Sequence, residues 1–587
     1  MEIEVNSRNF FTELKRRNVS KVAVAYAVVG WLLIQIATQV FPFLEIPNWA
    51  IRLVILLTAL GFPVALIIAW AFELTPEGIK RTEAADAAGQ RSRGGIWIAV
   101  VVVAAILSLG LFFLGRYTAG NATPRLHEAA TVIPHKSIAV LPLLNESGDP
   151  KDEYFSDGLS EELIAALAQI SGLKVIGRSS SFRFKDRTEE PKTIGKKLGV
   201  SSLLEGTVRK QGDRVRIVAE LINAADGIEV WTRTFDRELK DIFAVQQEIA
   251  RAVAESLRVT LLGSEEKATQ MATDSVEAHN AYLQGHFYSV RRNTEDYRKA
   301  IDYFDQAIQL DPNYALAYAE RSEVWTVIGD LTGQRSTAFP NARSDAEKAV
   351  AIAPSLAEAH AALGWVRAFV EWKFAEGLSE LQRAKELSPA NPTANDLLAR
   401  VIVYTGRMEE AERQARQAVE LDPLSAAAQF TLGRVLFYSG KLDEAYAAGR
   451  KLAELQPSAS SSHRWQVLVA VQRGDGETAL REAQLEPDDT IRPFELALAQ
   501  YIRGDRKAAD AALAELIANS RDGLAYQVAQ VYAVRGEKDK AFEWLQIAFD
   551  HHDGGMPSLL VDPLLRGLRD DPRYKNLVAK VGLPTTS

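Results

Sequence analysis

The chain of 587 residues contains no cysteine, 4 methionines and 8 histidines. The absence of cysteine excludes disulfides, thiolate zinc sites, iron–sulfur ligation and a cysteine nucleophile. No HExxH motif and no phosphate-binding loop of the GxxxxGK type occurs. Acidic residues (76) outnumber basic ones (68), whereas a general nucleic-acid binder is expected to be basic. The sequence therefore predicts a protein that is not an enzyme, with no catalytic site, cofactor or metal and no nucleic-acid partner.

Long apolar runs occur only near the N-terminus. They cover residues 22–41, 51–72 and 96–114. At ~1.5 Å per residue, each run is long enough to cross a hydrocarbon core of ~30 Å. We expect three transmembrane helices in a membrane region over 22–115, behind a cytoplasmic tail, residues 1–21. Lys and Arg cluster before the first run and between the second and third, which by the positive-inside rule places the N-terminus in the cytoplasm. The expected location is the inner (cytoplasmic) membrane of a bacterium, multi-pass in the lipid bilayer, with residues 116–587 in the periplasm.

Residues 116–135 have few apolar side chains and read as a linker. From residue 136 to 262 the pattern indicates β-α-β-α-β-β-β-α, which predicts an α/β domain with a mixed sheet. Glu161 and Glu162 are predicted at the start of its first helix. They either complement the helix dipole or act as general acid and base. Basic residues interleave with aromatic ones from Arg178 to Arg187, either as a solvated face or as a patch for an anionic ligand.

A proline motif recurs after residue 275. It is found as Leu310-Asp311-Pro312, Ile352-Ala353-Pro354, Leu387-Ser388-Pro389, Leu421-Asp422-Pro423 and Leu455-Gln456-Pro457. The prolines are 42, 35, 34 and 34 residues apart, with alanines at fixed offsets before them. A tetratricopeptide repeat (TPR) is a helix-turn-helix of about 34 residues with a proline near its end. We therefore expect residues 275–587 to form an all-α TPR solenoid of about eight helix pairs, with 556–587 as a C-terminal cap.

Two segments carry a family resemblance. SIAVLPLLNESGDPKDEYFSDGLSEELIAALAQISGLKVIGRSSSFRFK and LLEGTVRKQGDRVRIVAELINAADGIEVWTRTFDRELKDIFAVQQEIA resemble the TolB-like (FlgO-like) domain of bacterial envelope and signalling proteins, over residues 137 to about 260. FFTELKRRNVSKVAVAYAVVGWLLIQIA resembles the membrane leader of such proteins, and VDPLLRGLRDDPRYKNLVAKVGLP resembles the terminal segment of the TPR family. Some relatives carry a nucleotide-cyclase or a CadC-like winged-helix domain. The resemblance implies an accessory, binding role for the middle domain.

The expected function is that of a membrane-anchored scaffold or receptor that binds a protein or peptide in its TPR groove. The alternative is a component of a signalling system related to adenylate-cyclase or CadC-type regulators that lacks the effector domain. Self-association of the chain stays open. The first helix of each repeat lines the concave face of such a solenoid. Counted along each repeat, the predicted partner-binding residues are Arg321, Trp365, Asp396, Arg400, Phe430, Arg434 and Phe437. Arginine suits carboxylates and aromatic rings suit apolar anchors, which favours an extended peptide with an acidic group or a free C-terminus. The competing reading is that these arginines pair with acids on neighbouring helices.

Overall fold

The computed structural model divides the chain into two compact units, residues 1–127 and 128–587, and each is described by itself. The structure describes residues 134, 136–170, 172–257, 273–291, 293–519 and 523–584 of the second unit. Of the first unit it describes positions 26, 29, 30, 56, 58, 60–63, 72–75 and 78–81.

The first unit contributes an antiparallel pair of strands, β1 (Phe72–Thr75) and β2 (Gly78–Arg81). Phe72 was expected to end a membrane helix. Instead it begins β1, whose backbone pairs with that of β2. No helix within the described residues is long and apolar enough to cross a bilayer. This finding contradicts the fold class with three transmembrane helices and the multi-pass inner-membrane location, so both predictions are wrong. The predicted cytoplasmic tail and the third apolar run lie wholly outside the described residues. Most of the first run, most of the second run and most of the linker lie outside them as well.

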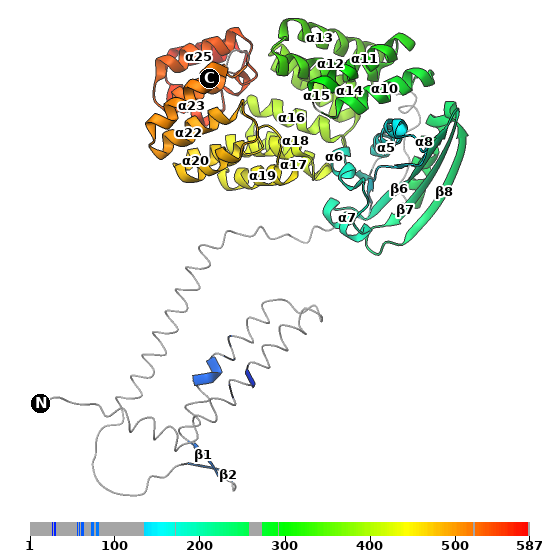
Figure 1. The fold of residues 1–587 in the computed structure, drawn as a ribbon, viewed down its shortest axis with the longest axis horizontal. Coiled ribbons are helices and arrows are strands. Elements are labelled where there is room, and N and C mark those ends of the chain that lie inside the picture. The colour runs from blue at the N-terminus through cyan, green and yellow to red at the C-terminus, as the bar shows by residue number, and fades with distance from the viewer. Residues whose placement is uncertain are drawn as a thin grey trace, which may run out of the picture. The chain divides into compact units, whose positions relative to one another are not determined.

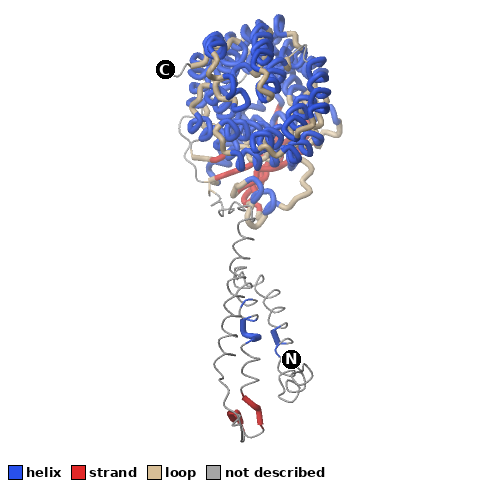
Figure 2. The backbone as a smooth tube through the Cα atoms, turned by 90° about the vertical axis from the view of Figure 1, so that its left-hand side faces the viewer, coloured by secondary structure: helices blue, strands red, loops and turns tan. Residues whose placement is uncertain are grey.

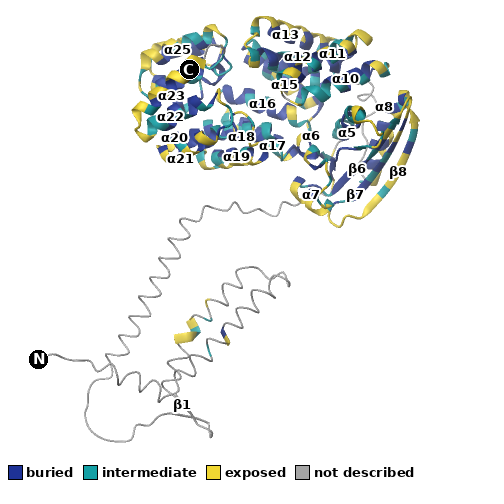
Figure 3. Ribbon diagram, viewed as in Figure 1, coloured by how far each residue is buried: buried dark blue, intermediate teal, exposed yellow. Residues whose placement is uncertain are grey.

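The second unit begins with a mixed sheet in the order β5-β3-β6-β7-β8, with β4 beside β6. Its strands are β3 (Ser137–Val140), β4 (Leu144–Asn145), β5 (Lys174–Val175), β6 (Ser202–Gln211), β7 (Arg214–Asn223) and β8 (Glu229–Glu238). β3 runs parallel to β5 and β6, whereas β6, β7 and β8 are antiparallel. The predicted mixed sheet is therefore present. β8 forms one edge and is exposed along most of its length (Figure 3).

Helices cover both faces of this sheet (Figure 1). On one face, α5 (Glu153–Ala168) and α8 (Ile242–Ser256) bury an apolar side that includes Leu163 and Ile249. On the other, α7 (Pro191–Leu198) packs with the short turn η2 (Phe182–Phe184), while α6 (Arg178–Ser181) leads into that turn. The second face is thus covered only near β3 and the start of β6, and α5 has a second side left for the repeats.

The rest of the second unit is a helical TPR-like solenoid. Within the described residues its helices form eight antiparallel pairs: α10 (Val276–Ser289) with α11 (Thr294–Leu310), α12 (Ala315–Thr332) with α13 (Arg335–Ile352), α14 (Ala357–Trp365) with α15 (Phe374–Leu387), α16 (Pro392–Tyr404) with α17 (Met408–Leu421), α18 (Ala426–Tyr438) with α19 (Leu442–Leu455), α20 (Arg464–Arg473) with α21 (Gly476–Leu485), α22 (Arg492–Arg503) with α23 (Arg506–Asn519), and α24 (Ala525–Val534) with α25 (Lys538–Asp550). A π-helical turn, η4 (Val366–Val370), extends α14.

Local sequence explains where these helices begin and end. The Leu or Ile of each proline motif is the last residue of the second helix in the first five pairs. The next helix is then started by a cap, as where the Ser425 and Asn391 side chains accept the amide N–H of Ala428 and Ala394. In the later pairs the first helix stops at Gly474 or Gly504, both with positive φ, which glycine adopts without strain.

The solenoid winds around a common axis, so that its end returns towards its early repeats (Figure 2). The C-terminal turns η6 (Met556–Ser558) and η7 (Pro563–Leu568) and helix α26 (Pro572–Lys580) share a hydrophobic core with residues of the third repeat. At this closure the ring of His552 stacks on Trp372, with ring centroids 3.6 Å apart.

The α/β domain and the first repeats share one hydrophobic core. This core runs from Val140 on the sheet through Leu159 on α5 to Leu283 on α10. The contact is close, because a Cβ atom at Gly158 would lie 2.6 Å from the Leu283 side chain. α5 is therefore held between its own sheet and the start of the solenoid.

Candidate functional site

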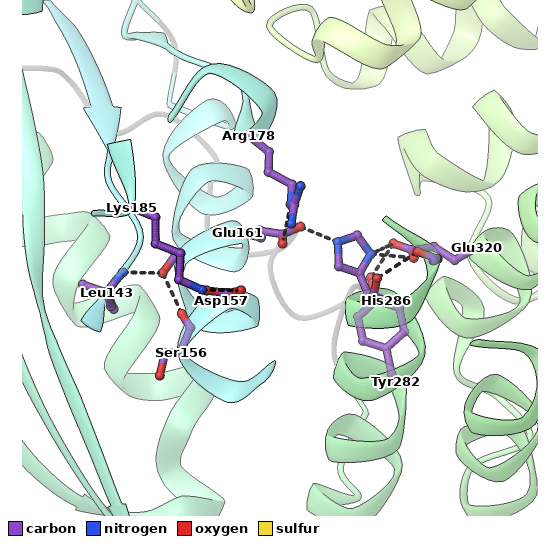
Figure 4. Close-up of polar contacts among 11 residues, drawn as sticks. Leu143, Ser156, Asp157, Glu161, Arg178, Lys185, Tyr282, His286 and Glu320 are labelled. Carbon is purple, nitrogen blue, oxygen red and sulfur yellow. Dashed lines mark hydrogen bonds and ion pairs between the residues drawn. The ribbon is translucent and has the colours of Figure 1, made fainter. Parts of the chain in front are cut away.

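Charged side chains join α5 to α10 and α12 at the start of the solenoid (Figure 4). His286 of α10 lies between two carboxylates: its Nδ1 is 2.6 Å from Glu320 Oε2, and its Nε2 contacts Glu161. The Nε of Arg178 is 2.5 Å from the other Glu161 oxygen, and the Tyr282 hydroxyl donates to Glu320 at 2.9 Å. We call Glu161, Arg178, His286 and Glu320 the interdomain cluster.

The electrostatics of this cluster favour charged groups. Burial lowers the pKa of His286, but Glu161 and Glu320 outweigh burial and raise its pKa well above the usual 6.5. Burial raises the pKa of Glu161, but His286 and Arg178 outweigh it and hold that pKa below the usual 4.5. Glu161 and Glu162 do not open the helix as predicted, because α5 begins at Glu153 and both lie in its middle. There Glu161 binds His286, and Glu162 contacts His279 at 2.5 Å.

The α/β domain contacts the solenoid a second time, at the turn that follows α17. The amide of Gly177 donates to the Leu421 carbonyl at 2.8 Å, and the amide of Ser180 donates to Asp422 at 2.7 Å. The Ser180 hydroxyl also bonds to Asp422 and accepts the Leu424 amide at 2.7 Å. Arg183 reaches the Leu455 carbonyl at 2.6 Å. The basic and aromatic segment from Arg178 onward therefore docks on the repeats.

A cavity of about 240 Å³ lies on the concave side of the later repeats. We call it the arginine cavity, because three arginines from successive first helices line it: Arg400 of α16, Arg434 of α18 and Arg464 of α20. Its other lining residues are Asp330, Phe369, Tyr404, Tyr438, Trp465, Leu468, Phe494, Gly523, Tyr526, Gln527, Gln530, Asp553, Gly554, Gly555 and Ser558. The cavity thus combines cationic groups with aromatic walls.

Two of these arginines are positioned by aromatic rings. The Arg400 guanidinium lies 4.1 Å from the ring centroid of Trp365, which itself stacks on Phe369 at 4.7 Å. Arg434 donates to the Tyr404 hydroxyl at 2.7 Å and lies 5.1 Å from the Phe430 ring centroid. Such stacking holds a guanidinium in place.

Arg464 is the least compensated of the three. Its Nε is buried and has no hydrogen-bond partner among the described residues. Burial and the like charge of Arg434 lower the pKa of Arg464 from 12.5 against the attraction of Glu495. Burial also raises the pKa of Glu495 well above its usual value. The cavity therefore brings three arginines together with two aspartates, Asp330 and Asp553.

The structure brings four of the sequence-predicted partner-binding residues together. Arg400 and Arg434 line the arginine cavity, Trp365 lies under Arg400, and Phe430 packs against Arg434 and Trp465. Phe437 contacts Trp465 as well, but is 1% exposed and belongs to the hydrophobic core. Whether these side chains bind a partner stays a prediction.

The remaining two predicted residues do not line the arginine cavity. Arg321 is held by Asp345 through two hydrogen bonds of 2.7 and 2.8 Å and also contacts Asp305. This geometry matches the competing reading, in which arginines pair with acids on neighbouring helices. Asp396 is buried on α16.

Sequence reasoning missed Arg464, Tyr526, Gln527 and Asp553, which also line the cavity. Counting a further 34 residues from Arg434 reaches Leu468, which is itself a lining residue, and Arg464 lies one helical turn before it. The repeat period was therefore a usable signal for α20. It could not identify Asp553, because the segment after α25 belongs to no repeat.

Two segments of the chain match known protein families. Residues 134–252 match the family described as HilA/YgeH-like transcriptional regulator, second domain, and residues 282–314 match the tetratricopeptide repeat family. The middle domain is thus similar to a regulator domain, while the TolB-like assignment is not confirmed. The TPR prediction is confirmed at this repeat.

A curated relative named "Putative adenylate cyclase 3", from Rhizobium meliloti (strain 1021), is 37% identical over 206 residues. The chain spans about a third of that relative's length, since the match covers 35% of each protein. This agrees coarsely with the expected link to cyclase-related proteins.

Among solved structures, the chain is similar to YrrB, described as a TPR protein with an unusual peptide-binding site. The identity is 21% and the TM-score 0.25, with 36% of this chain and 96% of that one covered. A tetratricopeptide repeat protein from Parabacteroides merdae is 14% identical with a TM-score of 0.29, covering 50% and 100%.

Proposed function

We propose that this protein is a scaffold that binds an extended segment of a partner protein on the concave face of its repeats. An acidic group of that segment would be bound at Arg400 and Arg434. The observation that carries the proposal is the arginine cavity, where arginines of three successive first helices meet aromatic walls. A planar guanidinium can donate two parallel hydrogen bonds to a carboxylate.

Preorganisation supports this assignment. Arg400 is stacked on Trp365, and Arg434 is held by Tyr404, so little side-chain entropy remains to be lost when a ligand binds. Arg321 does not line the cavity and is paired with Asp345. We therefore place the anionic contact at the later repeats and assign Arg321 a structural role.

The proposal gives the α/β domain an accessory role. It occupies the start of the solenoid through α5, and it contacts the turn after α17 through Ser180. Residues 136–262 and 275–587, proposed as two domains, would then act as one binding body.

Peptide arrays probed with the full chain test the proposal. We expect the wild type to bind a subset enriched in acidic residues. Replacing either Arg400 or Arg434 by Ala should weaken that binding by roughly 5- to 150-fold, because one lost anchor typically costs ~1–3 kcal/mol, and replacing both should weaken it further. The matched control is Arg383→Ala with Arg407→Ala, which removes two exposed arginines that pair locally with Glu386 and Glu410. Equal binding by both double variants would refute the proposed site.

A second candidate function is favoured by the cyclase-named relative: a component of a cyclase-related signalling system. We propose that the chain takes part in it by binding rather than by catalysis. The pure full chain should then show no turnover of ATP. Reproducible turnover that one point substitution abolishes would contradict this.

A further inference from the structure

Among the described residues, the mixed sheet has one long open edge, β8 (Figure 1). At the opposite edge β5 has only two residues, and the solenoid covers the chain just after it, where the amide of Gly177 donates to the Leu421 carbonyl at 2.8 Å. β8 has ten residues, contains neither proline nor glycine, and is exposed along most of its length. Proteins usually shorten, cover or interrupt an edge strand, because its unpaired backbone groups attract another strand. A long open edge of this kind therefore indicates a partner strand.

The backbone groups that face outward from β8 follow from its pairing with β7. The amide of Leu239, just after β8, donates to the carbonyl of Asp213, just before β7, at 2.7 Å. The direction of hydrogen bonding alternates along an antiparallel strand, so the odd-numbered residues after 230 bond to β7. The register with β7 shifts once, between Leu221 and Ile222, near the start of β8. Beyond this shift, residues 232, 234, 236 and 238 direct their N–H and C=O groups outward in a regular row.

The side chains of this segment alternate between the two faces of the sheet. Trp231 and Phe235 pack against the hydrophobic core that contains α5 and α8. Arg233 and Arg237 stand on the same face, and the Arg233 guanidinium lies 5.8 Å from the ring centroid of Trp231. The opposite face carries polar side chains, namely Thr232, Thr234 and Asp236. The segment thus alternates aromatic rings with cations on one face and is polar on the other.

A second copy of β8 is complementary to this pattern. When two copies run antiparallel with Thr234 opposite Thr234, Trp231 of each copy lies opposite Arg237 of the other. In the same arrangement, Phe235 lies opposite Arg233. Directly opposite side chains are close enough to interact, and a cation beside an aromatic ring is a favourable pair. Every arginine of the segment would therefore meet an aromatic ring of the other copy.

The remaining contacts select this register over its neighbours. Thr232 would lie opposite Asp236, whose carboxylate can accept the threonine hydroxyl. Moving one copy by two residues in either direction would place Arg233 opposite Arg233 or opposite Arg237, and like charges that lie opposite are destabilising. Moving it by one residue would bring core-facing side chains opposite those of the other face. We infer that β8 pairs antiparallel with β8 of a second copy, centred on Thr234, so that two mixed sheets join into one.

Cysteine cross-linking of the purified full chain tests the register, because the chain has no cysteine of its own. Thr234→Cys should give a disulfide-linked dimer, since opposite residues of a hydrogen-bonded pair have Cα atoms about 5.5 Å apart, within the range of disulfides. Thr232→Cys is the matched control on the same strand and face. Its two copies would be separated by roughly 13 Å of strand, too far for a disulfide. Mixed with Asp236→Cys, the residue opposite, it should cross-link.

Charge substitutions test the association itself. Thr234→Lys and Thr234→Glu each place like charges opposite one another and should weaken the dimer by about twofold to fivefold. An equimolar mixture of the two variants should restore it, because Lys then lies opposite Glu, and this recovery requires both variants to be folded. Thr232→Lys is the control, since it would lie opposite Asp236 and should not weaken the dimer. Analytical ultracentrifugation of the full chain measures the dissociation constants.

The wild type should sediment as a dimer at high concentration and dissociate on dilution. A full chain that stays monomeric at every concentration would overturn the inference. Equal cross-linking of Thr234→Cys and Thr232→Cys would overturn it as well, as would a dimer that Thr234→Lys does not weaken, because association would then use another surface. β8 and the arginine cavity share no residue, so this inference and the proposed function can fail independently.

Discussion

The Ser180 hydroxyl is one of the groups that connect the α/β domain to the solenoid. It bonds to Asp422 and accepts the Leu424 amide at 2.7 Å, both on the turn after α17. Asp422 is 5% exposed, and burial raises its pKa against the bonds from Ser180, so its charge depends on these donors. The neighbouring Ser181 hydroxyl is buried without a partner among the described residues.

Ser180→Ala should therefore destabilise the protein, whereas Ser181→Ala should not. The first change leaves the Leu424 amide without its acceptor and the Asp422 carboxylate with one donor fewer, at a cost of about 1–3 kcal/mol. The second removes a hydroxyl that makes no hydrogen bond to the described residues. Denaturant unfolding of both variants measures the difference. Equal midpoints for the two variants would contradict the role given to Ser180.

At the scale of helices, small residues set how closely a pair packs. Gly364 on α14 and Gly377 on α15 face each other, and a Cβ at Gly364 would lie 2.9 Å from the Gly377 carbonyl oxygen. Backbone atoms cannot move aside as a flexible side chain does. The close contact between α14 and α15 therefore requires a small residue at position 364.

Gly364→Ala should cost about 1–3 kcal/mol, because an added methyl group overpacks the contact between α14 and α15. Gly567→Ala is the control, since a Cβ at that position meets nothing within 4 Å. Thermal melting should show a fall for the first variant and little change for the second. A fall of the same size in both would mean that glycine flexibility, and not the helix contact, is responsible.

At the scale of the whole second unit, the interdomain cluster makes docking of the α/β domain depend on pH. The folded pKa of His286 is raised, so its stabilisation is complete below the usual 6.5 and is lost as the pH rises through the folded value. The folded pKa of Glu161 is lowered, so its stabilisation is present above the usual 4.5 and is lost as the pH falls through the folded value. The contact is therefore strongest between these limits.

The melting temperature of the wild type should exceed that of His286→Gln most strongly near pH 6. Their difference should shrink as the pH rises through the folded pKa of His286, because a tenfold change in proton affinity between the folded and unfolded protein corresponds to about 1.4 kcal/mol. Calorimetry from pH 6 to pH 10 measures this. His551→Gln, an exposed histidine outside the cluster, is the control. A wild-type advantage that stays constant over this range would contradict the charged state assigned to His286.

Much of the fold was predictable because its signals are local. The Leu or Ile of each proline motif ends a helix, Gly474 and Gly504 stop helices by adopting positive φ, and the strands of the mixed sheet follow the apolar pattern. The membrane prediction failed for the opposite reason. The prediction of membrane helices rested on the length of the apolar runs. The structure instead shows a strand at Phe72, where a helix was expected to end.

The sequence by itself determined the repeat architecture, the mixed sheet and the alignment of Arg400 with Arg434, because each depends on spacing within one or two repeats. Only the tertiary structure decided that Arg464, Gln527 and Asp553 join them, since the curvature of the solenoid accumulates over many repeats and brings its end back to them. It also decided that Asp422 of a repeat motif binds Ser180, and that Glu161 binds His286. Such contacts depend on two surfaces meeting in space, which no periodicity in the chain records.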